Sequence, residues 1–146
     1  MKYPYLILIP LVAVGVTQLL KFIIAASRGQ WRWSVLLEYG GMPSAHTAFV
    51  ISLTTVVGLS SGYKSAAFAI AAVFAIIIIR DAIGLRQFLS EHGRILNMLI
   101  KDLPDDQETK YPTHVTEHLG HTPLQATVGG IIGFVIAWSM YTWLVV

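Results

Sequence analysis

The sequence contains no cysteine and few charged residues. The absence of cysteine excludes disulfide bonds and thiol chemistry. Asp, Glu, Lys and Arg together make up 12% of the chain, whereas soluble domains contain about 25%. The expected solvent is therefore a lipid bilayer. The net charge of +2 is small and forms no basic block, so we expect no nucleic-acid partner.

Long apolar segments take the place of that charge, with 55% of the residues hydrophobic. At 146 residues the chain is expected to form one domain, 1–146. We predict an all-α integral membrane bundle of about four transmembrane helices, and the second and third are shorter than the ~20 residues that a span prefers. The predicted helices cover residues 3–26, 45–59, 66–79 and 123–146.

The first apolar segment also has features of a signal peptide, with Lys2 before it and small residues after it. It is longer than the apolar region of a signal peptide and contains Lys21. We therefore interpret it as a membrane helix.

Residues 80–122 are mixed in character. Apolar side chains at helical spacing predict an amphipathic continuation of the third helix near the membrane interface, and residues 103–112 are predicted to form an exposed loop. The apolar positions are Ile83, Leu85, Phe88, Leu89, Ile95, Leu96, Leu99 and Ile100.

Small residues recur at helical spacing in two of the predicted helices. Ala67, Ala71 and Ala75 share one face of the third helix, and Gly129 and Gly133 share one face of the fourth. Such faces allow membrane helices to approach closely. We predict that both faces pack against other helices.

Polar chemistry falls on one side of the predicted bundle. With four crossings, the ends of helices one and three and the starts of helices two and four lie together. All of the Lys and Arg residues except Lys2 and Lys64 fall there, with every Asp, Glu and His. The positive-inside rule predicts that this side is cytoplasmic. We expect it to be the working face.

The stretch GGMPSAH opens the second helix. The N–H groups of Ser44, Ala45 and His46 would lie at the positive end of the helix, where anions such as phosphate bind. Gly41 permits close backbone approach, and the His46 imidazole can transfer protons near neutral pH. An ordinary helix start with a histidine at headgroup level is the alternative.

Several cations could join this anion site. Lys21 and Arg28 are seven residues apart, on one helix face, and two such cations suit a doubly charged phosphate. Snorkelling to the headgroups is the alternative for Lys21. Arg80 and Asp81 end the third helix, as part of a functional site or as a self-neutralising pair. Arg86 follows and could face the site or water.

His121 lies at the start of the fourth helix, before Thr122-Pro123. Gln125 is on the same face four residues later, within reach of a hydrogen bond to the imidazole. We predict that His121 and His46 face each other across one polar pocket. A zinc site is the rival interpretation, since His114 and His118 have the i, i+4 spacing of zinc ligands, with Glu117 and His121 nearby.

Three groups of residues carry a resemblance to a known family. Lys21 and Arg28 have its first-motif spacing, Pro43-Ser44-Ala45-His46 matches its second motif with Ala for Gly, and His121 with Pro123, Gln125 and Gly129 is similar to the end of its third. The chain resembles the type 2 phosphatidic acid phosphatase superfamily, which includes the vanadium haloperoxidases, and specifically its small divergent membrane branch. It departs at Gly29 for proline, Val115 for arginine and Gln125 for an acid.

The resemblance implies metal-independent hydrolysis of a lipid phosphomonoester or diphosphate, without a cofactor. It makes His121 the nucleophile that forms a phosphohistidine, with His46 as acid and base. It also implies a homodimer that completes the pocket, because the superfamily core has six helices. Asp81 and Gln125 are the candidates to support His121, and the substrate-binding candidates are Lys21, Arg28, Gly41, Ser44, Arg80 and Arg86.

Two other classes of function remain open at this point. A phosphate-lipid binding or transport protein could keep the pocket without turnover, because Gln125 cannot stabilise an imidazolium as a carboxylate does. A purely structural membrane protein is the third class. It leaves the one-sided placement of His and Arg unexplained.

Overall fold

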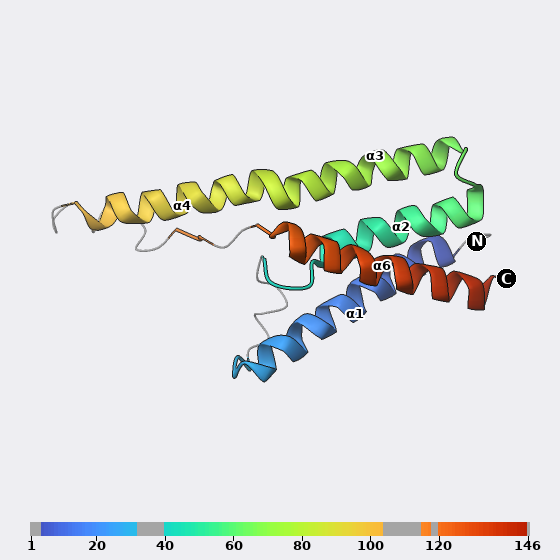
Figure 1. Cartoon of the computed structure of the whole chain (residues 1–146), viewed down its shortest axis with the longest axis horizontal. Coiled ribbons are helices and arrows are strands. Elements are labelled where there is room, and N and C mark those ends of the chain that lie inside the picture. The colour runs from blue at the N-terminus through green and yellow to red at the C-terminus, as the bar shows by residue number, and fades with distance from the viewer. Residues whose placement is uncertain (1–3, 32–39, 104–114, 118–119, 146) are drawn as a thin grey trace.

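The computed structural model describes residues 4–31, 40–103, 115–117 and 120–145. These residues form an all-helical bundle, which confirms the predicted fold class (Figure 1). The elements are α1 (Tyr5–Ser27), α2 (Ala45–Ser61), α3 (Ala66–Arg80), the π-helical turn η2 (Asp81–Leu85), α4 (Arg86–Lys101) and α6 (Pro123–Leu144).

Three helices in the described part of the chain are long and apolar enough to cross a membrane. They are Tyr5–Ser27, the continuous helix Ala66–Lys101 and Pro123–Leu144, whereas α2 has 17 residues. The predicted boundaries of α1, α2, α3 and α6 differ from the observed ones by a few residues at most, and α4 then continues α3 without a break. The second helix continues to Ser61 because Gly62, at φ 83°, is the residue that ends it.

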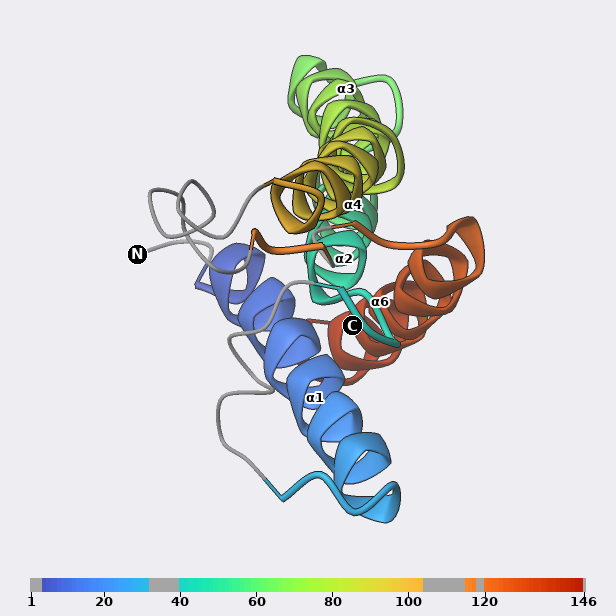
Figure 2. The same ribbon diagram turned by 90° about the vertical axis from the view of Figure 1, so that its left-hand side faces the viewer.

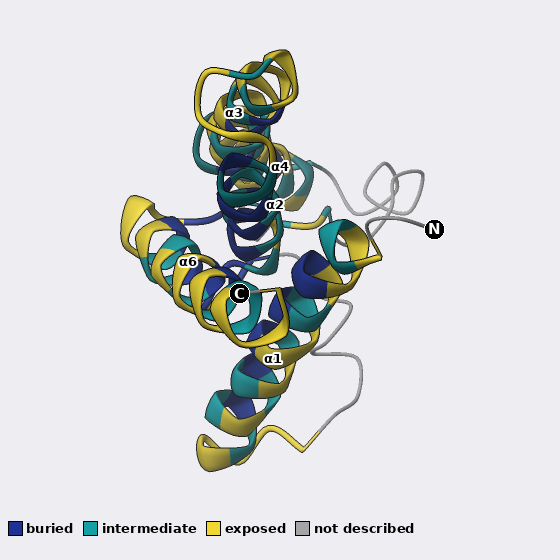
Figure 3. Ribbon diagram, turned by 90° about the vertical axis from the view of Figure 1, so that its right-hand side faces the viewer, coloured by how far each residue is buried: buried dark blue, intermediate teal, exposed yellow. Residues whose placement is uncertain are grey.

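Helix α2 lies at the centre of the bundle. It packs against α1, α3 and α6, and α1 also packs against α6 (Figure 2). The buried positions form stripes on the inner faces, and the outer faces are exposed (Figure 3). At the end of the bundle near both chain termini, the core contains Ile9, Val56 and Ala137. Tyr5 and Tyr141 close this end with an edge-to-face ring contact at 5.8 Å.

Small residues bring α6 and α3 against α2. A methyl group at Gly129 or Gly133 would overlap the α2 backbone, at Ser44 and Ala48 respectively. On the other side of α2, Ala71 and Ala75 are buried. Thr54 Oγ1 donates to the Ala71 carbonyl at 3.2 Å. The predicted packing faces are thus confirmed, except that Ala67 is exposed.

The predicted amphipathic continuation is α4, which continues α3 in one line through η2 and extends past the start of α6 (Figure 1). The side chain of Asn97 binds residues 115–117, the returning chain that leads from α4 back to α6. Its Nδ2 donates to Val115 O and its Oδ1 accepts from Val115 N–H, both at 2.8 Å. Gly93 is needed beside it, because a Cβ there would lie 2.7 Å from Thr116 O. The predicted loop lies outside the described residues from 104 onward.

Candidate functional site

Most of the predicted site residues lie around the starts of α2 and α6 and the turn η2, on the side of the bundle away from the termini (Figure 1): Lys21, Gly41, Ser44, His46, Asp81, Arg86, His121 and Gln125. His121 precedes α6 and is buried, with 6% of its surface exposed. His46 is the second residue of α2 and is exposed. The two imidazoles interact electrostatically with each other and with Lys21. Two helix starts and one helix interior therefore supply the centre of the candidate site.

The π-helical turn η2 positions the His121 backbone. Arg86 N–H donates to Asp81 O, five residues earlier, and to Gly84 O, instead of to Ala82 O as in an α-helix. Ala82 O accepts from His121 N–H at 3.0 Å. The irregular turn thus provides a backbone acceptor that anchors the start of α6 to the α3–α4 helix.

Two carbonyl oxygens determine the tautomer of His121. Its Nδ1 lies 3.1 Å from Gly41 O and 3.3 Å from Gln125 Oε1. The Gln125 amide is oriented by a capping box, in which Oε1 accepts from Thr122 N–H at 3.0 Å. Since both neighbours of Nδ1 are acceptors, Nδ1 carries the proton in neutral His121. Nε2 then keeps its lone pair.

Burial sets the protonation state of His121. Desolvation lowers the pKa of His121 below the usual 6.5, opposed by the hydrogen bonds to Gln125 and Gly41. The positive charges of His46 and Lys21 lower the pKa further. A lowered pKa means that the imidazole is neutral at neutral pH and gains a proton only as the pH falls below 6.5.

Lys21 lies over the turn that holds His121. Its side chain is 9% exposed although the residue is charged. A Cβ at Gly41 would lie 3.1 Å from Lys21 Cε and 3.8 Å from Nζ. Gly41 also has φ 79°, in the left-handed region that favours glycine. The backbone conformation therefore favours glycine there, and a Cβ would also push the end of the Lys21 side chain aside by a few tenths of an ångström.

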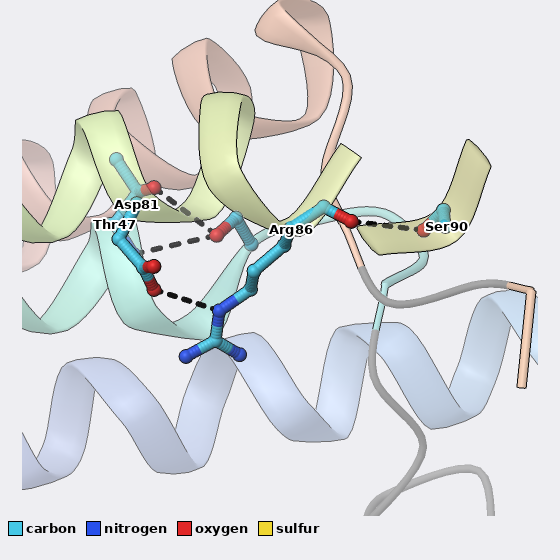
Figure 4. A network of polar contacts seen from close by, with 5 residues as sticks. Thr47, Asp81, Arg86 and Ser90 are labelled. Carbon is cyan, nitrogen blue, oxygen red and sulfur yellow. Dashed lines mark hydrogen bonds and ion pairs between the residues drawn. The ribbon is translucent and has the colours of Figure 1, made fainter. Parts of the chain in front are cut away.

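Arg86 is the second cation of the site, and it is paired with Asp81. Arg86 Nε donates to Asp81 Oδ2 at 2.8 Å, and Ser90 Oγ donates to the Arg86 carbonyl at 3.0 Å (Figure 4). The charges of Arg86 and Asp81 both act on His46. The structure thus brings Asp81 to Arg86, whereas Gly41 and Gln125 take the place expected for Asp81 beside His121.

The remaining predicted cations lie at the periphery. Arg28 is exposed at the C-terminal cap of α1, and Arg80 is exposed at the end of α3. Helix α1 ends at Ser27, immediately before Arg28, and of these two cations only Lys21 is buried. Of Arg80 and Arg86, Arg86 is therefore the one whose charge acts on a histidine of the site.

Ser44 closes the packing between α2 and α6. It is fully buried and caps α2, since its hydroxyl accepts from Thr47 N–H at 3.4 Å. Its own N–H donates to Gln125 O at 3.2 Å. The sequence predicted that the N–H groups of Ser44, Ala45 and His46 face an anion. The Ser44 N–H is therefore already hydrogen-bonded, and those of Ala45 and His46 are left for the predicted anion site.

The residues of the rival zinc site are only partly described. His114 and His118 lie outside the described residues. Glu117 Oε1 accepts from Asn97 Nδ2 at 2.6 Å, and His121 Nδ1 faces Gly41 and Gln125. Within the ranges that the structure describes, no three His, Cys, Asp or Glu residues gather into a metal-binding group.

Comparison with known proteins identifies the family. A sequence model described as "Divergent PAP2 family" matches residues 4–136. The chain belongs to the divergent PAP2 family. It is also 36% identical over 114 residues to the "Uncharacterized membrane protein YuiD" of Bacillus subtilis (strain 168), a match covering 71% of this chain and 72% of the relative. No solved structure matches. The resemblance seen in the motifs is confirmed, and this divergent PAP2 protein is an integral membrane protein.

Sequence reasoning missed the backbone groups of the site. The carbonyls of Gly41 and Ala82 hold His121, yet a carbonyl has no residue-type signal. The glycine pair at Gly40 and Gly41 indicated a close approach, but its partners turned out to be Lys21 and His121. No pattern in the sequence marked the π-helical turn.

Proposed function

We propose that this divergent PAP2 protein is a metal-independent lipid-phosphate phosphatase that acts through a phosphohistidine on His121. The lipid tail stays in the bilayer while the phosphate enters the polar end of the bundle. This end carries Lys21, Arg86 and both histidines, which supplies positive charge and proton transfer together. The family membership agrees with a phosphatase-related function.

The proposed reaction has two steps. In the first, His121 Nε2 attacks phosphorus, the bond to the leaving oxygen breaks, and His46 gives that oxygen a proton. In the second, His46 takes a proton from a water molecule that attacks the phosphohistidine, the bond between phosphorus and His121 Nε2 breaks, and phosphate leaves. Lys21 and Arg86 hold the nonbridging oxygens, and the N–H groups at the start of α2 stabilise the developing charge.

The observation that supports this proposal most is the environment of His121. A nucleophilic histidine needs a neutral ring, a fixed tautomer and an open Nε2. The acceptors at Nδ1 supply the tautomer, at 3.1 Å for Gly41 O and 3.3 Å for Gln125 Oε1. Burial supplies the neutral ring by lowering the pKa of His121. Gly41 and Gln125 thus perform the orienting role of the acid that the superfamily motif contains.

Exchanging Gln125 for glutamate tests this assignment. Glutamate preserves the capping box, and its carboxylate beside Nδ1 raises the pKa of His121. Because attack requires neutral His121, we expect the acidic limb of the pH profile of kcat/KM to move to higher pH, by roughly 1 unit or more. Above that limb, the rate of Gln125→Glu should exceed that of wild type. A limb that is unchanged, or moves to lower pH, contradicts the assignment.

The function itself is tested with a panel of lipid phosphates. Phosphate release is measured in detergent from phosphatidate, phosphatidylglycerophosphate, and polyprenyl phosphate and diphosphate, using wild type, Lys21→Met and Arg28→Met. Lys21 is buried in the site and Arg28 is exposed at its edge. We therefore expect Lys21→Met to lose roughly 10²-fold in kcat/KM, with a much smaller loss for Arg28→Met. Equal losses would remove Lys21 from the phosphate site.

A phosphate-lipid binding or transport protein is the second candidate function. The specific observation in its favour is Gln125, because an amide cannot stabilise an imidazolium as a carboxylate does. This candidate predicts saturable binding of a lipid phosphate to wild type, with no phosphate release from any member of the panel. Binding without release would replace the phosphatase proposal.

The location and orientation of the proposed enzyme follow from the side of the bundle that carries most of its charged residues. We place the protein in a plasma or inner membrane with the site on the cytoplasmic side, on the basis of the positive-inside rule. We also propose a homodimer, since the superfamily core that the motifs resemble has six helices.

A further inference from the structure

Helix α4 extends beyond the part of the bundle that matches the bilayer. The continuous helix Ala66–Lys101 has 36 residues, or about 54 Å, whereas a bilayer with its headgroups is about 40–45 Å thick. Helices α1 and α6, with 23 and 22 residues, are much shorter. Figure 1 shows α4 running on past the start of α6. Its apolar side chains therefore project beyond the hydrocarbon region, where lipid tails do not cover them.

Four leucines and one histidine of η2 and α4 follow a seven-residue repeat, and the exposed apolar side chains of Phe88 and Ile95 flank it on one side. The positions of this α4 seam are Leu85, Leu89, His92, Leu96 and Leu99, at spacings of 4, 3, 4 and 3 residues. That is the 3.5-residue repeat of the a and d positions in a coiled coil. The four leucines are between 48% and 64% exposed.

The neighbouring faces of α4 are consistent with a helix pair. Gln87, Arg94 and Lys101 are exposed and lie on the side opposite the seam. The returning chain packs on one flank, through Asn97 and Gly93. The described residues that contact α4 therefore lie on its flank, and the four seam leucines stay exposed.

We propose that the α4 seam pairs in parallel with the same seam of a second copy. Two copies inserted in one membrane have the same orientation, so their α4 helices leave the bilayer side by side and in register. A seam this short is marginal in isolation, but confinement to the membrane raises the effective concentration of the partner helix. His92 favours this pairing over burial in lipid, because an ionisable side chain is costly in hydrocarbon.

The absence of cysteine allows a direct test by cross-linking. Leu96→Cys and Leu99→Cys are placed in the seam of the full-length protein, reconstituted at low density in phospholipid vesicles. A parallel pair brings each new thiol next to its own copy. We expect mild oxidation, or a short thiol-specific cross-linker, to give several-fold more covalent dimer than in the matched controls Arg94→Cys and Lys101→Cys on the opposite face.

Two outcomes would overturn the proposal. The first is equal cross-linking at seam and control positions, which indicates random collision. The second is no dimer together with quenching of a fluorophore at Leu99→Cys by spin-labelled lipid, which shows that α4 lies in the membrane surface. An independent check is Leu89→Asp in the Leu99→Cys background, which should reduce the covalent dimer several-fold. Since none of these readouts uses catalysis, they are independent of the proposed phosphatase.

Discussion

His121→Ala is expected to abolish phosphate release from lipid phosphates, with a loss of more than about 10³-fold in kcat. The reason is that Nε2 of this residue is the proposed nucleophile, and among the described histidines it is the one whose other nitrogen faces two acceptors. The measurement is single-turnover phosphate release in detergent. His121→Gln, which keeps a polar side chain, should be equally inactive.

Trapping the intermediate makes this prediction specific. With His46→Ala and an aryl phosphate, whose leaving group needs no proton, the first step does not require the missing acid whereas the second step lacks its base, so phosphate should accumulate on the protein. Labelled phosphate should be recovered at His121 after an alkaline quench, because N–P bonds hydrolyse in acid. His46→Ala itself should lose roughly 10²–10⁴-fold in turnover. Label on any residue other than His121, or full activity of His121→Ala, would remove His121 from the nucleophile role.

Gly129→Ala is expected to have the largest effect on the fold. A methyl group at this position would overlap the Ser44 carbonyl, and the neighbouring backbone atoms would be 3.0 and 3.1 Å away. These are backbone atoms, which cannot rotate aside as a side chain can. We expect a loss of about 3 kcal/mol or more in the free energy of unfolding, with loss of activity because the same contact positions the start of α2.

The adjacent glycine provides the control. A methyl group at Gly130 would meet Thr47 Cγ2 at 3.5 Å and Ile51 Cγ1 at 3.6 Å, which are ordinary contacts. Gly130→Ala should therefore leave the stability unchanged or raise it slightly, by less than about 1 kcal/mol. Both variants are compared by thermal or denaturant unfolding in the same detergent. Similar stabilities for the two would show that α2 and α6 are less closely packed than described.

The fold was predictable because its signals are large. Apolar segments of membrane length predicted the helices, and small residues at helical spacing predicted a close helix contact at Gly129 and Gly133, which the structure shows to be with α2. The continuation of α3 into α4 was predicted, but as an amphipathic segment near the membrane interface rather than as part of one straight helix, because a polar change begins at Arg80 although no proline interrupts residues 66–101. Apolar content, rather than backbone continuity, determined where the predicted helix ended.

The candidate site was predictable in its side chains and less so in its supports. The pattern around His46 and His121 predicted that two helix starts meet, which the structure shows. The predicted role of Asp81 beside His121 depended on the direction of its side chain, which sequence spacing does not specify. In the structure the Asp81 carboxylate pairs with Arg86 instead. The first-motif spacing likewise could not tell that α1 buries Lys21 and exposes Arg28.

The length of α2 has a consequence for how a lipid reaches the candidate site. Its 17 residues measure about 25 Å, against a hydrocarbon thickness of about 30 Å. Because α1, α3 and α6 surround α2 and its residues 47–60 are buried or half-buried, the neighbouring helices rather than the leaflets make up the difference in length. In the proposed reaction a lipid phosphate would therefore enter between those helices toward His46 at the start of α2, while its tails stay in the acyl layer.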